Sequence, residues 1–542
     1  MSRHSNGRFV LTGLLKFHEP FLIGGVDTDA GVDVSPMFNG AGDVLVPGTS
    51  LAGVLRSWIT ANCADISPLD IENIFGGIGD YSGASRIRID DVALRSAPKG
   101  RILLSNIDGV GIDRYTGAAA HGVKFDQTVV AGEPIGDLRI VCEVSELEDP
   151  LLSTAHKIMQ SIASVLSQQT LRLGRGTTKG FGLFSVPDVS IQLQRATQDG
   201  LFQRLAGTGE VITLEQKDVK KSSKITSITI KFASVGGVFT KASTAGTIVD
   251  VIPRVEPRSV SAELIPPDTS IRGVLRSEDE RSVSAALILP ATSIRGVLRS
   301  EAERIVRTLL SIQMSPEASH IDQVRVPLVD AMYGASPTRN DGPDQSTVST
   351  EDTRIGKACV SISAAFAPIC EWDQWKNVLA IATRKKSNTE NDRAKTEQEL
   401  VTATSGLPLE FTHHVALDRW TGAAADKMLY TVLEPTSGQW SGLKLELDEK
   451  RLGERYLPAL ALLMHSLQSL HAGDIGLGWG TYRGHGTIQI TSISIEGSAV
   501  NCDIKETGEW LWSDLESKDS KAASEIKTAW KTWLQTAREG AQ

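Results

Sequence analysis

A nine-residue stretch occurs twice in the chain, and no other feature limits the possible folds as strongly. It reads IDRYTGAAA at residues 112–120 and LDRWTGAAA at residues 417–425. Seven of the nine positions are identical, and the other two exchange one apolar or aromatic residue for another. Chance does not plausibly give such a match, so the repeat predicts two copies of one structural module in a single chain.

Further matches lie in the same order in both halves of the chain. The pattern V-D-V-x-P contains Asp33 in the first half and Asp250 in the second. A predicted helix with the sequence GVLRS follows in each half. Thr49 or Ser50 is its expected N-cap in the first half, and a matching Thr-Ser pair takes that place in the second.

Hydrophobic periodicity indicates an α+β fold in each half. In the first half we expect strands at 9–17 and 86–94, a helix through 51–59, hairpin arms at 123–130 and 138–144, a helix through 155–166 and a strand from residue 183. The second half repeats this order from a strand at 225–232. The sequence therefore predicts two tandem ferredoxin-like (RRM-like) modules, a split βαβ arrangement that often binds RNA on one face.

We place the first module at residues 1–205, a linker at 206–221, the second module at 222–498 and a tryptophan-containing helical tail at 499–542. The tail is expected to pack on the second module or to dock a partner. Blocks 258–280 and 281–303 are near-identical, and only one can supply the module's helix. We favour the second because its helical pattern continues, although the first has the better spacing from Asp250. The polar segments 336–355 and 384–404 are expected to be exposed, mobile loops.

The composition excludes several classes of protein. The sequence has no run of about 18 apolar residues and no apolar signal segment near its start, so we predict a cytoplasmic protein without a membrane partner. The five cysteines are scattered without a C-x-x-C pair, which fits a reducing compartment and argues against disulfides and structural zinc. The formal charge of −9 argues, weakly, against a free-standing nucleic-acid binder.

Each half ends in a loop with four glycines in nine residues. They are Gly174, Gly176, Gly180 and Gly182, and Gly478, Gly480, Gly484 and Gly486. Glycine permits positive φ and a close approach of backbone N–H groups to a phosphate, and Arg175, Lys179 and Arg483 add positive charge. The alternative is a tight helix-to-strand turn without a ligand. A nucleotide P-loop is excluded because the G-K-[ST] ending is missing.

Taken together, these motifs resemble the RAMP-superfamily backbone subunit of type III CRISPR effector complexes. The motifs are I-G-G at 23–25, P-G-T-S at 47–50, F-G-G at 75–77, the I-D-R-x-T-G-A stretch and the terminal glycine loop. The resemblance covers about residues 8–190 and 222–495. Two modules in one chain resemble the fused double-backbone subunit of subtype III-D.

The resemblance implies a filament on CRISPR RNA. A palm would hold guide phosphates, and a thumb hairpin after the nine-residue stretch would wedge between base pairs of the guide–target duplex. The implied partners are CRISPR RNA, single-stranded target RNA, other RAMP subunits and a large polymerase-like subunit. The residues expected to contact RNA are Ser50, Arg56, Gly174, Arg175, Gly176, Lys179, Gly180, Ser293, Arg299, Gly478, Gly480, Arg483 and Gly484. The expected thumb residues are Asp113, Arg114, Tyr115, Asp418, Arg419 and Trp420.

The same resemblance implies that a loop acid cleaves target RNA with Mg²⁺ or another divalent cation. Asp33 and Asp250 match that position and are the candidate catalytic residues and metal ligands. A loop carboxylate can hold such a cation while water fills most of its coordination shell, and Asp27 and Asp29 are placed to assist Asp33. The alternative for both candidates is a carboxylate that only accepts backbone N–H groups.

Other interpretations stay open at this level. Asp113 and Asp418 each precede an arginine, and we expect an ion pair that shapes the base of the thumb. His413 and His414 have no counterpart in the first half, which favours a solvated or phosphate-facing role over acid–base catalysis. The chain could also be a non-catalytic guide-binding backbone. A guide-processing endoribonuclease is disfavoured, because such an enzyme relies on histidine where this loop has aspartate.

Overall fold

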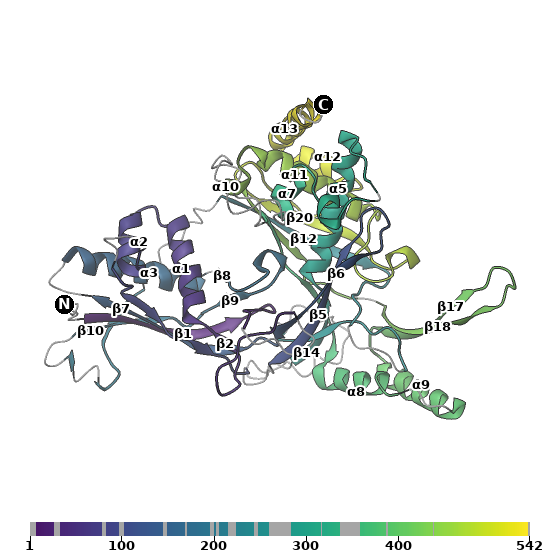
Figure 1. Ribbon diagram of the computed structural model, residues 1–542, viewed down its shortest axis with the longest axis horizontal. Helices are drawn as coiled ribbons and strands as arrows, with labels where there is room; N and C mark the ends of the chain where they lie inside the picture. The colour runs from purple at the N-terminus through teal and green to yellow at the C-terminus, as the bar shows by residue number, and fades with distance from the viewer. Residues whose placement is uncertain are drawn as a thin grey trace. The chain divides into compact units, whose positions relative to one another are not determined.

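The structure is a computed structural model that describes residues 7–25, 33–77, 83–96, 102–144, 149–168, 171–195, 200–201, 205–214, 224–242, 248–259, 283–315, 317–335, 358–385, 389–436 and 438–539. The chain forms two compact α+β units (Figure 1). Unit 1 consists of Met1–Ile107, Asp126–Thr177 and Phe181–Ser223, and unit 2 consists of Asp108–Phe125, Thr178–Gly180 and Lys224–Gln542. The predicted fold of two tandem ferredoxin-like modules is confirmed, and the first nine-residue stretch lies in unit 2.

Unit 1 is built on an antiparallel sheet with its helices on one face (Figure 1). Its strands are β1 (Gly7–Phe17), β3 (Ile87–Ile89), β7 (Ile135–Val144), β8 (Leu171–Arg172), β9 (Leu183–Ser185), β10 (Ser190–Arg195) and β11 (Glu210–Ile212). Its helices are α1 (Gly48–Asn62), α2 (Pro68–Phe75) and α3 (Asp149–Gln168). The central strand β1 pairs with β7, β9 and β10. The predicted apolar face of α3, which includes Ile158 and Ile162, is fully buried in this core.

The start of α1 differs from the prediction. The N-cap is Pro47, and no side chain accepts a capping hydrogen bond, so the expected role of Thr49 or Ser50 is wrong. A carboxylate from elsewhere performs this task, because Asp91 accepts the backbone N–H of Gly48 at 2.8 Å. The matching helix of the second module also has a proline N-cap, Pro290, and no side-chain capping hydrogen bond.

The strand pairing around the first nine-residue stretch also differs. Residues 86–94 form two short strands, β3 and β4 (Val92–Ala93), and β4 pairs with β2 (Leu45–Val46). The predicted hairpin of 123–130 with 138–144 does not form. Instead, β6 (Ala119–Ala131) pairs with β5 (Leu103–Ile112), and β7 is a strand of the main sheet. The nine-residue stretch therefore lies at the tip of a long hairpin.

Unit 2 repeats the architecture and extends it. Its main sheet has the strand order β15 (Val360–Ile362), β19 (Leu443–Asp448), β12 (Ile225–Val235), β20 (Thr487–Glu496) and β21 (Asn501–Ile504). A second sheet consists of β13 (Val255–Ser259), β14 (Val283–Leu289) and β16 (Ala365–Glu371), and a second long hairpin of β17 (Leu409–Leu417) and β18 (Ala424–Pro435). The helices are α5 (Ala291–Leu310), α6 (His320–Gln323), α7 (Val329–Tyr333), α8 (Trp372–Ala382), α9 (Glu390–Thr404), α10 (Glu449–Leu452), α11 (Tyr456–His471), α12 (Leu511–Lys518) and α13 (Ser520–Glu539).

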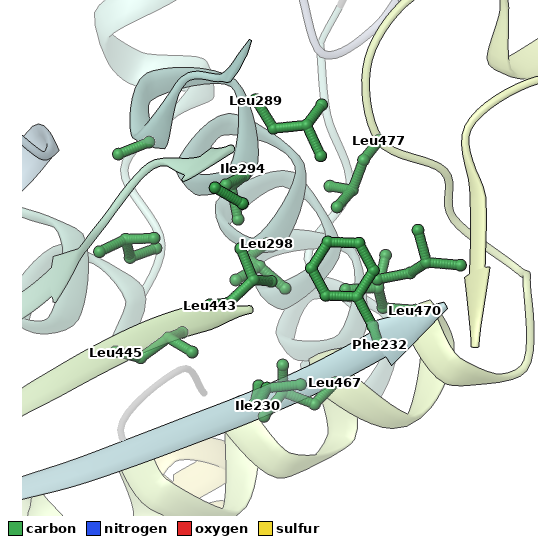
Figure 2. Packing of buried hydrophobic residues seen from close by; sticks show 14 of the residues in the cluster. Ile230, Phe232, Leu289, Ile294, Leu298, Leu443, Leu445, Leu467, Leu470 and Leu477 are labelled. Atoms are coloured by element: carbon green, nitrogen blue, oxygen red, sulfur yellow. The ribbon is translucent and has the colours of Figure 1, made fainter. Parts of the chain in front are cut away.

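The core of unit 2 lies between its main sheet and helices α5 and α11 (Figure 2). Ile294 and Leu298 of α5, Leu467 of α11 and Ile230 of β12 are fully buried in this core. Burying each such side chain contributes about 1.5–3 kcal/mol. Helix α5 comes from the second duplicated block, which confirms that choice. Most of the first block, residues 260–280, lies outside the described residues.

The insertion at 384–404 and the C-terminal tail both contain helices that pack in unit 2. Residues 390–404 form helix α9, so the expectation of a loop at 384–404 is wrong; Leu400 is fully buried and anchors the helix. The segment 336–355 lies outside the described residues. The tail packs on the second module as predicted, with Ile526 and Trp530 of α13 buried in its core. Trp510, just before α12, is 58% exposed.

Candidate functional site

Each module holds its loop aspartate against one strand of its long hairpin. In unit 1, the backbone N–H of Asp126 donates to Oδ2 of Asp33 at 2.9 Å, and the N–H of Asp33 donates to the Asp126 carbonyl at 3.1 Å. In unit 2, Thr431 makes the same two contacts with Asp250, at 2.9 and 3.0 Å. The shared V-D-V-x-P pattern therefore reflects one backbone geometry. In each module, one carboxylate oxygen accepts a backbone N–H group, which is the role that the alternative to catalysis predicted.

The two aspartates differ in how open they are to an external ligand. Asp33 is exposed, and its Oδ1 makes no hydrogen bond to any residue that the structure describes. Asp250 is half-buried, and the hydroxyl of Thr431 also contacts its Oδ2 at 3.1 Å. Asp27 and Asp29 lie outside the described residues. The geometry therefore favours Asp33 over Asp250 as a ligand for a cation or a substrate.

The nine-residue stretch folds into the same turn at both hairpin tips. The carboxylate of Asp113 accepts the backbone N–H groups of Tyr115 and Thr116 at 3.0 and 2.7 Å, and the Thr116 hydroxyl at 3.0 Å. Asp418 makes the three corresponding contacts at the same distances. These hydrogen bonds stabilise the ionised form, so the pKa of Asp113 falls to about 2 and that of Asp418 is also lowered. The two aspartates therefore stabilise the turn at the hairpin tip. Neither forms the expected ion pair with the arginine that follows it.

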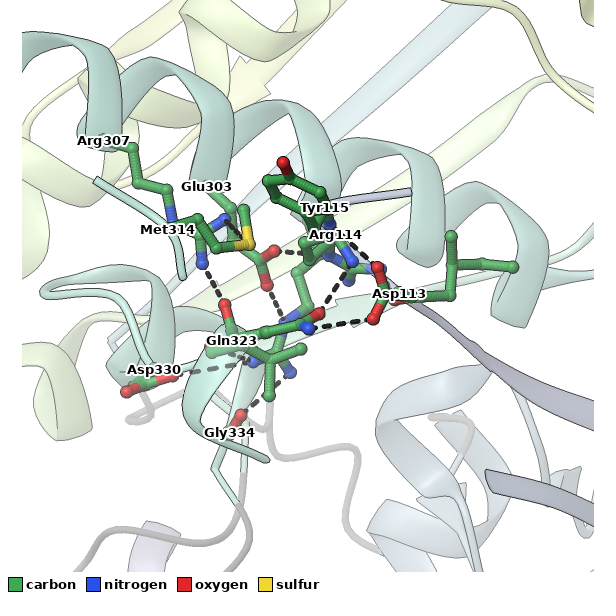
Figure 3. Close-up of polar contacts among 12 residues, drawn as sticks. Asp113, Arg114, Tyr115, Glu303, Arg307, Met314, Gln323, Asp330 and Gly334 are labelled. Carbon is green, nitrogen blue, oxygen red and sulfur yellow. Dashed lines mark hydrogen bonds and ion pairs between the residues drawn. The ribbon is translucent and has the colours of Figure 1, made fainter. Parts of the chain in front are cut away.

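The first tip is docked on helices α5 and α6 within unit 2 (Figure 3). The Nε of Arg114 donates to Oε2 of Glu303 at 2.6 Å, and the N–H of Arg114 donates to Oε1 of Gln323 at 2.8 Å. The side-chain amide of Gln323 donates to Oδ2 of Asp113 at 2.8 Å. The side chains of Arg114 and Glu303 are 13% and 1% exposed, so this ion pair is largely buried. Glu303 and Gln323 together form what we call the socket of the first tip.

The socket also engages Arg299, which the sequence analysis assigns to RNA. Its Nε donates to Oε1 of Glu303 at 2.7 Å, and its other nitrogens donate to the carbonyls of Gly334 and Val324 at 3.0 and 2.9 Å. The guanidinium therefore has protein acceptors in several directions. This geometry favours a structural role for Arg299 over a phosphate contact.

The glycine loops lie directly beside the segments that lead to the aspartate loops. A Cβ at Gly174 would be 2.5 Å from the carbonyl oxygen of Leu22, and one at Gly478 would be 2.2 Å from that of Phe239. The next N–H, of Arg175 or of Trp479, donates to that carbonyl at 2.7 Å. Both glycines have positive φ, as expected. Glycine is needed at both positions because the backbone packs closely within the protein, as the alternative of a tight turn without a ligand predicted.

Positive charge remains on the surface of these loops. Arg175, Lys179 and Arg483 are exposed, and Gly484 has open space around the position of a Cβ. Tyr482, beside Arg483, is fully exposed. Since base–aromatic stacking is a common way to hold single-stranded RNA, Tyr482 is a candidate contact that the sequence analysis missed.

An aromatic and ionisable cluster at the base of the second hairpin was also missed. The ring of His414 stacks on Tyr430 with centroids 5.1 Å apart, and its Nε2 lies 2.6 Å from the carboxylate of Glu434. Arg483 donates to the Tyr430 hydroxyl at 2.5 Å. Strand register brings these residues together, because His414 pairs with Tyr430 across β17 and β18. No sequence pattern carries that register.

Among the residues that the structure describes, no three His, Cys, Asp or Glu side chains gather closely enough to hold an ion. No helix in the described parts of the chain is long and apolar enough to cross a membrane.

These features define a protein of two tandem ferredoxin-like modules, each with a long hairpin and a glycine-rich loop packed beside an acidic loop. The family model described as the RAMP superfamily matches residues 14–185 and 281–489, which is more than half of the chain. The chain belongs to the RAMP superfamily. Among solved structures it is similar to a chain from a cryo-EM structure of type III-B Cmr-beta in the apo state. That match has 12% identity and a TM-score of 0.29, and covers 33% of this chain and 96% of the other. No curated protein matches.

Proposed function

We propose that the chain is a backbone subunit of a type III CRISPR RNA-guided effector complex, in the fused double form of subtype III-D. It binds CRISPR RNA and target RNA, and cleaves the target through its loop aspartates. Membership of the RAMP superfamily across both modules supports this proposal. One observation carries it further: the same acidic loop, hairpin strand and glycine loop are packed together twice in one chain. Two sites with the same backbone geometry on one chain suit a ligand with a regular repeat, as RNA is.

The proposed partners follow from this role. They are the CRISPR RNA, the single-stranded target RNA, other RAMP subunits and a large polymerase-like subunit. Exposed Arg175, Lys179 and Arg483 are the first candidates for phosphate contacts, and Tyr482 for base stacking. Because the formal charge of the chain is −9, RNA binding would depend on this local surface and on neighbouring subunits.

Asp33 is the catalytic residue that we assign first. The N–H of Asp126 orients its carboxylate through Oδ2, and Oδ1 would hold Mg²⁺ or another divalent cation. When bound, such a cation stabilises the charge that develops on the scissile phosphate. Asp33 supplies the negative charge that keeps the cation at the surface of the loop.

For the second module, a non-catalytic backbone role is the competing candidate. Asp250 is half-buried, and both the N–H and the hydroxyl of Thr431 contact its Oδ2. A carboxylate with these contacts stabilises the packing of the loop against the hairpin. The two modules would then bind RNA alike but cleave it unequally.

Asp33→Asn separates the chemical role from the structural one. Asparagine keeps an oxygen for the Asp126 N–H but loses the charge, so folding should be retained. In a complex assembled with guide and matching RNA, we expect one spaced cut to slow by about 100-fold, as EDTA would slow all of them. Asp65→Asn, at another exposed position of unit 1, is the matched control. If Asp33→Asn and Asp250→Asn leave every cut in place, the nuclease assignment is wrong.

A further inference from the structure

Arg483 of the second glycine loop is held in place without losing its charge to a carboxylate. Its guanidinium donates to the Tyr430 hydroxyl at 2.5 Å. It also lies over two aromatic rings, 5.4 Å from the centre of Tyr430 and 5.5 Å from that of Trp479. No carboxylate of a residue that the structure describes forms an ion pair with it. Arg299, by contrast, pairs with the buried carboxylate of Glu303.

The ring of Tyr430 is itself supported by a histidine and a glutamate. It stacks on His414 with the ring centres 5.1 Å apart and an angle of 11° between the planes. Nε2 of His414 lies 2.6 Å from Oε1 of Glu434, and Nε2 of His485 lies 3.8 Å from the same oxygen. The carboxylate is therefore engaged with histidines. These contacts form a continuous chain from Glu434 through His414 and Tyr430 to Arg483.

The first module lacks the polar groups of this chain. The equivalent positions, counted from the repeated nine-residue stretch, hold Gly109, Phe125 and Val129. The Phe125 ring fills the space beside Gly109, where a Cβ would be 2.1 Å from it. Lys179 stands at the position of Arg483, and an ammonium lacks the planar fork that a fixed acceptor can orient. An aromatic ring packed across the hairpin is therefore common to both modules, whereas the hydroxyl, imidazole and carboxylate belong to the second.

We propose that Tyr430 and His414 are positioning residues that hold Arg483 ready to bind a phosphate of RNA. This inference rests on the proposed RNA-binding function. A mobile arginine loses rotamer freedom when it binds a ligand, and a hydroxyl that already orients the guanidinium removes part of that cost. Because the hydroxyl is neutral, the guanidinium keeps its charge and has further N–H groups to donate to an anion. The fully exposed ring of Tyr482 precedes it and can stack on a neighbouring base.

Three substitutions in the full-length chain separate positioning from direct contact. Tyr430→Phe removes only the hydroxyl, His414→Ala removes the ring behind Tyr430, and Arg483→Ala removes the contact itself. Tyr333→Phe is the matched control, because that hydroxyl is buried and has no hydrogen-bond partner among the described residues. Binding to a fluorescein-labelled single-stranded oligouridine is measured by fluorescence anisotropy over a series of salt concentrations.

The expected effects differ in size and in their dependence on salt. Arg483→Ala should weaken binding by about 10-fold and reduce the slope of log affinity against log salt by about 0.7, the value for one phosphate contact with a single strand. Tyr430→Phe should weaken binding by about fivefold with an unchanged slope, because it removes no charge, and His414→Ala by about threefold. In the Arg483→Ala background, Tyr430→Phe should add nothing. The control should bind like wild type.

A second readout needs no RNA. NMR relaxation of the arginine Nε–H groups reports how freely each guanidinium moves. We expect Arg483 to be ordered in the wild-type chain and mobile in Tyr430→Phe, while the control leaves it ordered.

The possible failures of the inference and of the proposed function can be told apart. Wild-type RNA affinity in Tyr430→Phe, or a mobile Arg483 in the wild-type chain, would overturn the positioning role alone. A reduced salt slope in Tyr430→Phe that matches the one in Arg483→Ala would also overturn it, since the hydroxyl would then act through charge. A wild-type chain that binds no RNA even at low salt, although Arg483 is ordered, would instead overturn the RNA-binding function on which the inference rests.

Discussion

The two hairpin tips are nearly identical in sequence, yet one is docked and the other is exposed. Both fold the same turn, with an aspartate that accepts two backbone N–H groups and a threonine hydroxyl. Only the first contacts the socket of Glu303 and Gln323. The comparison teaches that the repeated sequence encodes the shape of the tip, while the surface that receives it decides what the tip does.

The largest expected effect comes from removing the charge of Glu303. Glu303→Gln would leave the guanidinium groups of Arg114 and Arg299 close together without the carboxylate that both contact. Breaking a buried pair from one side typically costs 3–5 kcal/mol, so we expect the free energy of unfolding of unit 2 to fall by about 3 kcal/mol in chemical denaturation. Glu317→Gln, at an exposed site, is the control and should change it by less than about 0.5 kcal/mol. An equally small effect of Glu303→Gln would mean that the first tip is not docked.

A second comparison uses the arginines of the two tips. Arg114→Ala leaves Glu303 with one of its two guanidinium partners, so we expect a loss of about 2 kcal/mol in the free energy of unfolding. Arg419→Ala should change this free energy by less than about 0.5 kcal/mol in the isolated chain, because its side chain is exposed. Equal losses from the two substitutions would remove the distinction between the tips.

The smallest effect concerns pH. The pKa of Asp113 is lowered to about 2 by the N–H groups of the turn and by the amide of Gln323. A lowered folded-state pKa adds stability that is present above about pH 4, the unfolded value, and is lost as the pH falls toward 2. We therefore expect wild type to lose more stability than Asp113→Asn between pH 5 and pH 2 in acid titrations. Identical acid profiles for the two proteins would contradict this role of the carboxylate.

The sequence predicts the parts of this molecule that depend on local patterns. The buried face of α3, the helix of the second duplicated block, the positive φ of Gly174 and Gly478 and the packed tail all follow from periodicity, spacing or backbone sterics. The pairing of β5 with β6 was not predicted, because strands 103–112 and 119–131 are broken by glycine and polar residues that hide their alternation.

The contacts that distinguish the two tips could not be predicted from one sequence. Arg114 is 189 residues from Glu303 and 209 from Gln323 along the chain, and no local rule connects positions so far apart. The charge of Arg299 suggested RNA, whereas its acceptors are protein carbonyls and Glu303. Asp33 and Asp250 look equivalent in sequence, and only their exposure and the hydroxyl of Thr431 separate them.

The most direct test of the difference between the tips is amide hydrogen exchange at two equivalent positions. The N–H of Arg114 donates to Gln323 within the socket, whereas the N–H of Arg419 donates to no described residue. In the full-length chain, we expect exchange at Arg114 to be at least about 100-fold slower than at Arg419. Similar exchange rates at the two positions would contradict the claim that one tip is docked and the other is exposed.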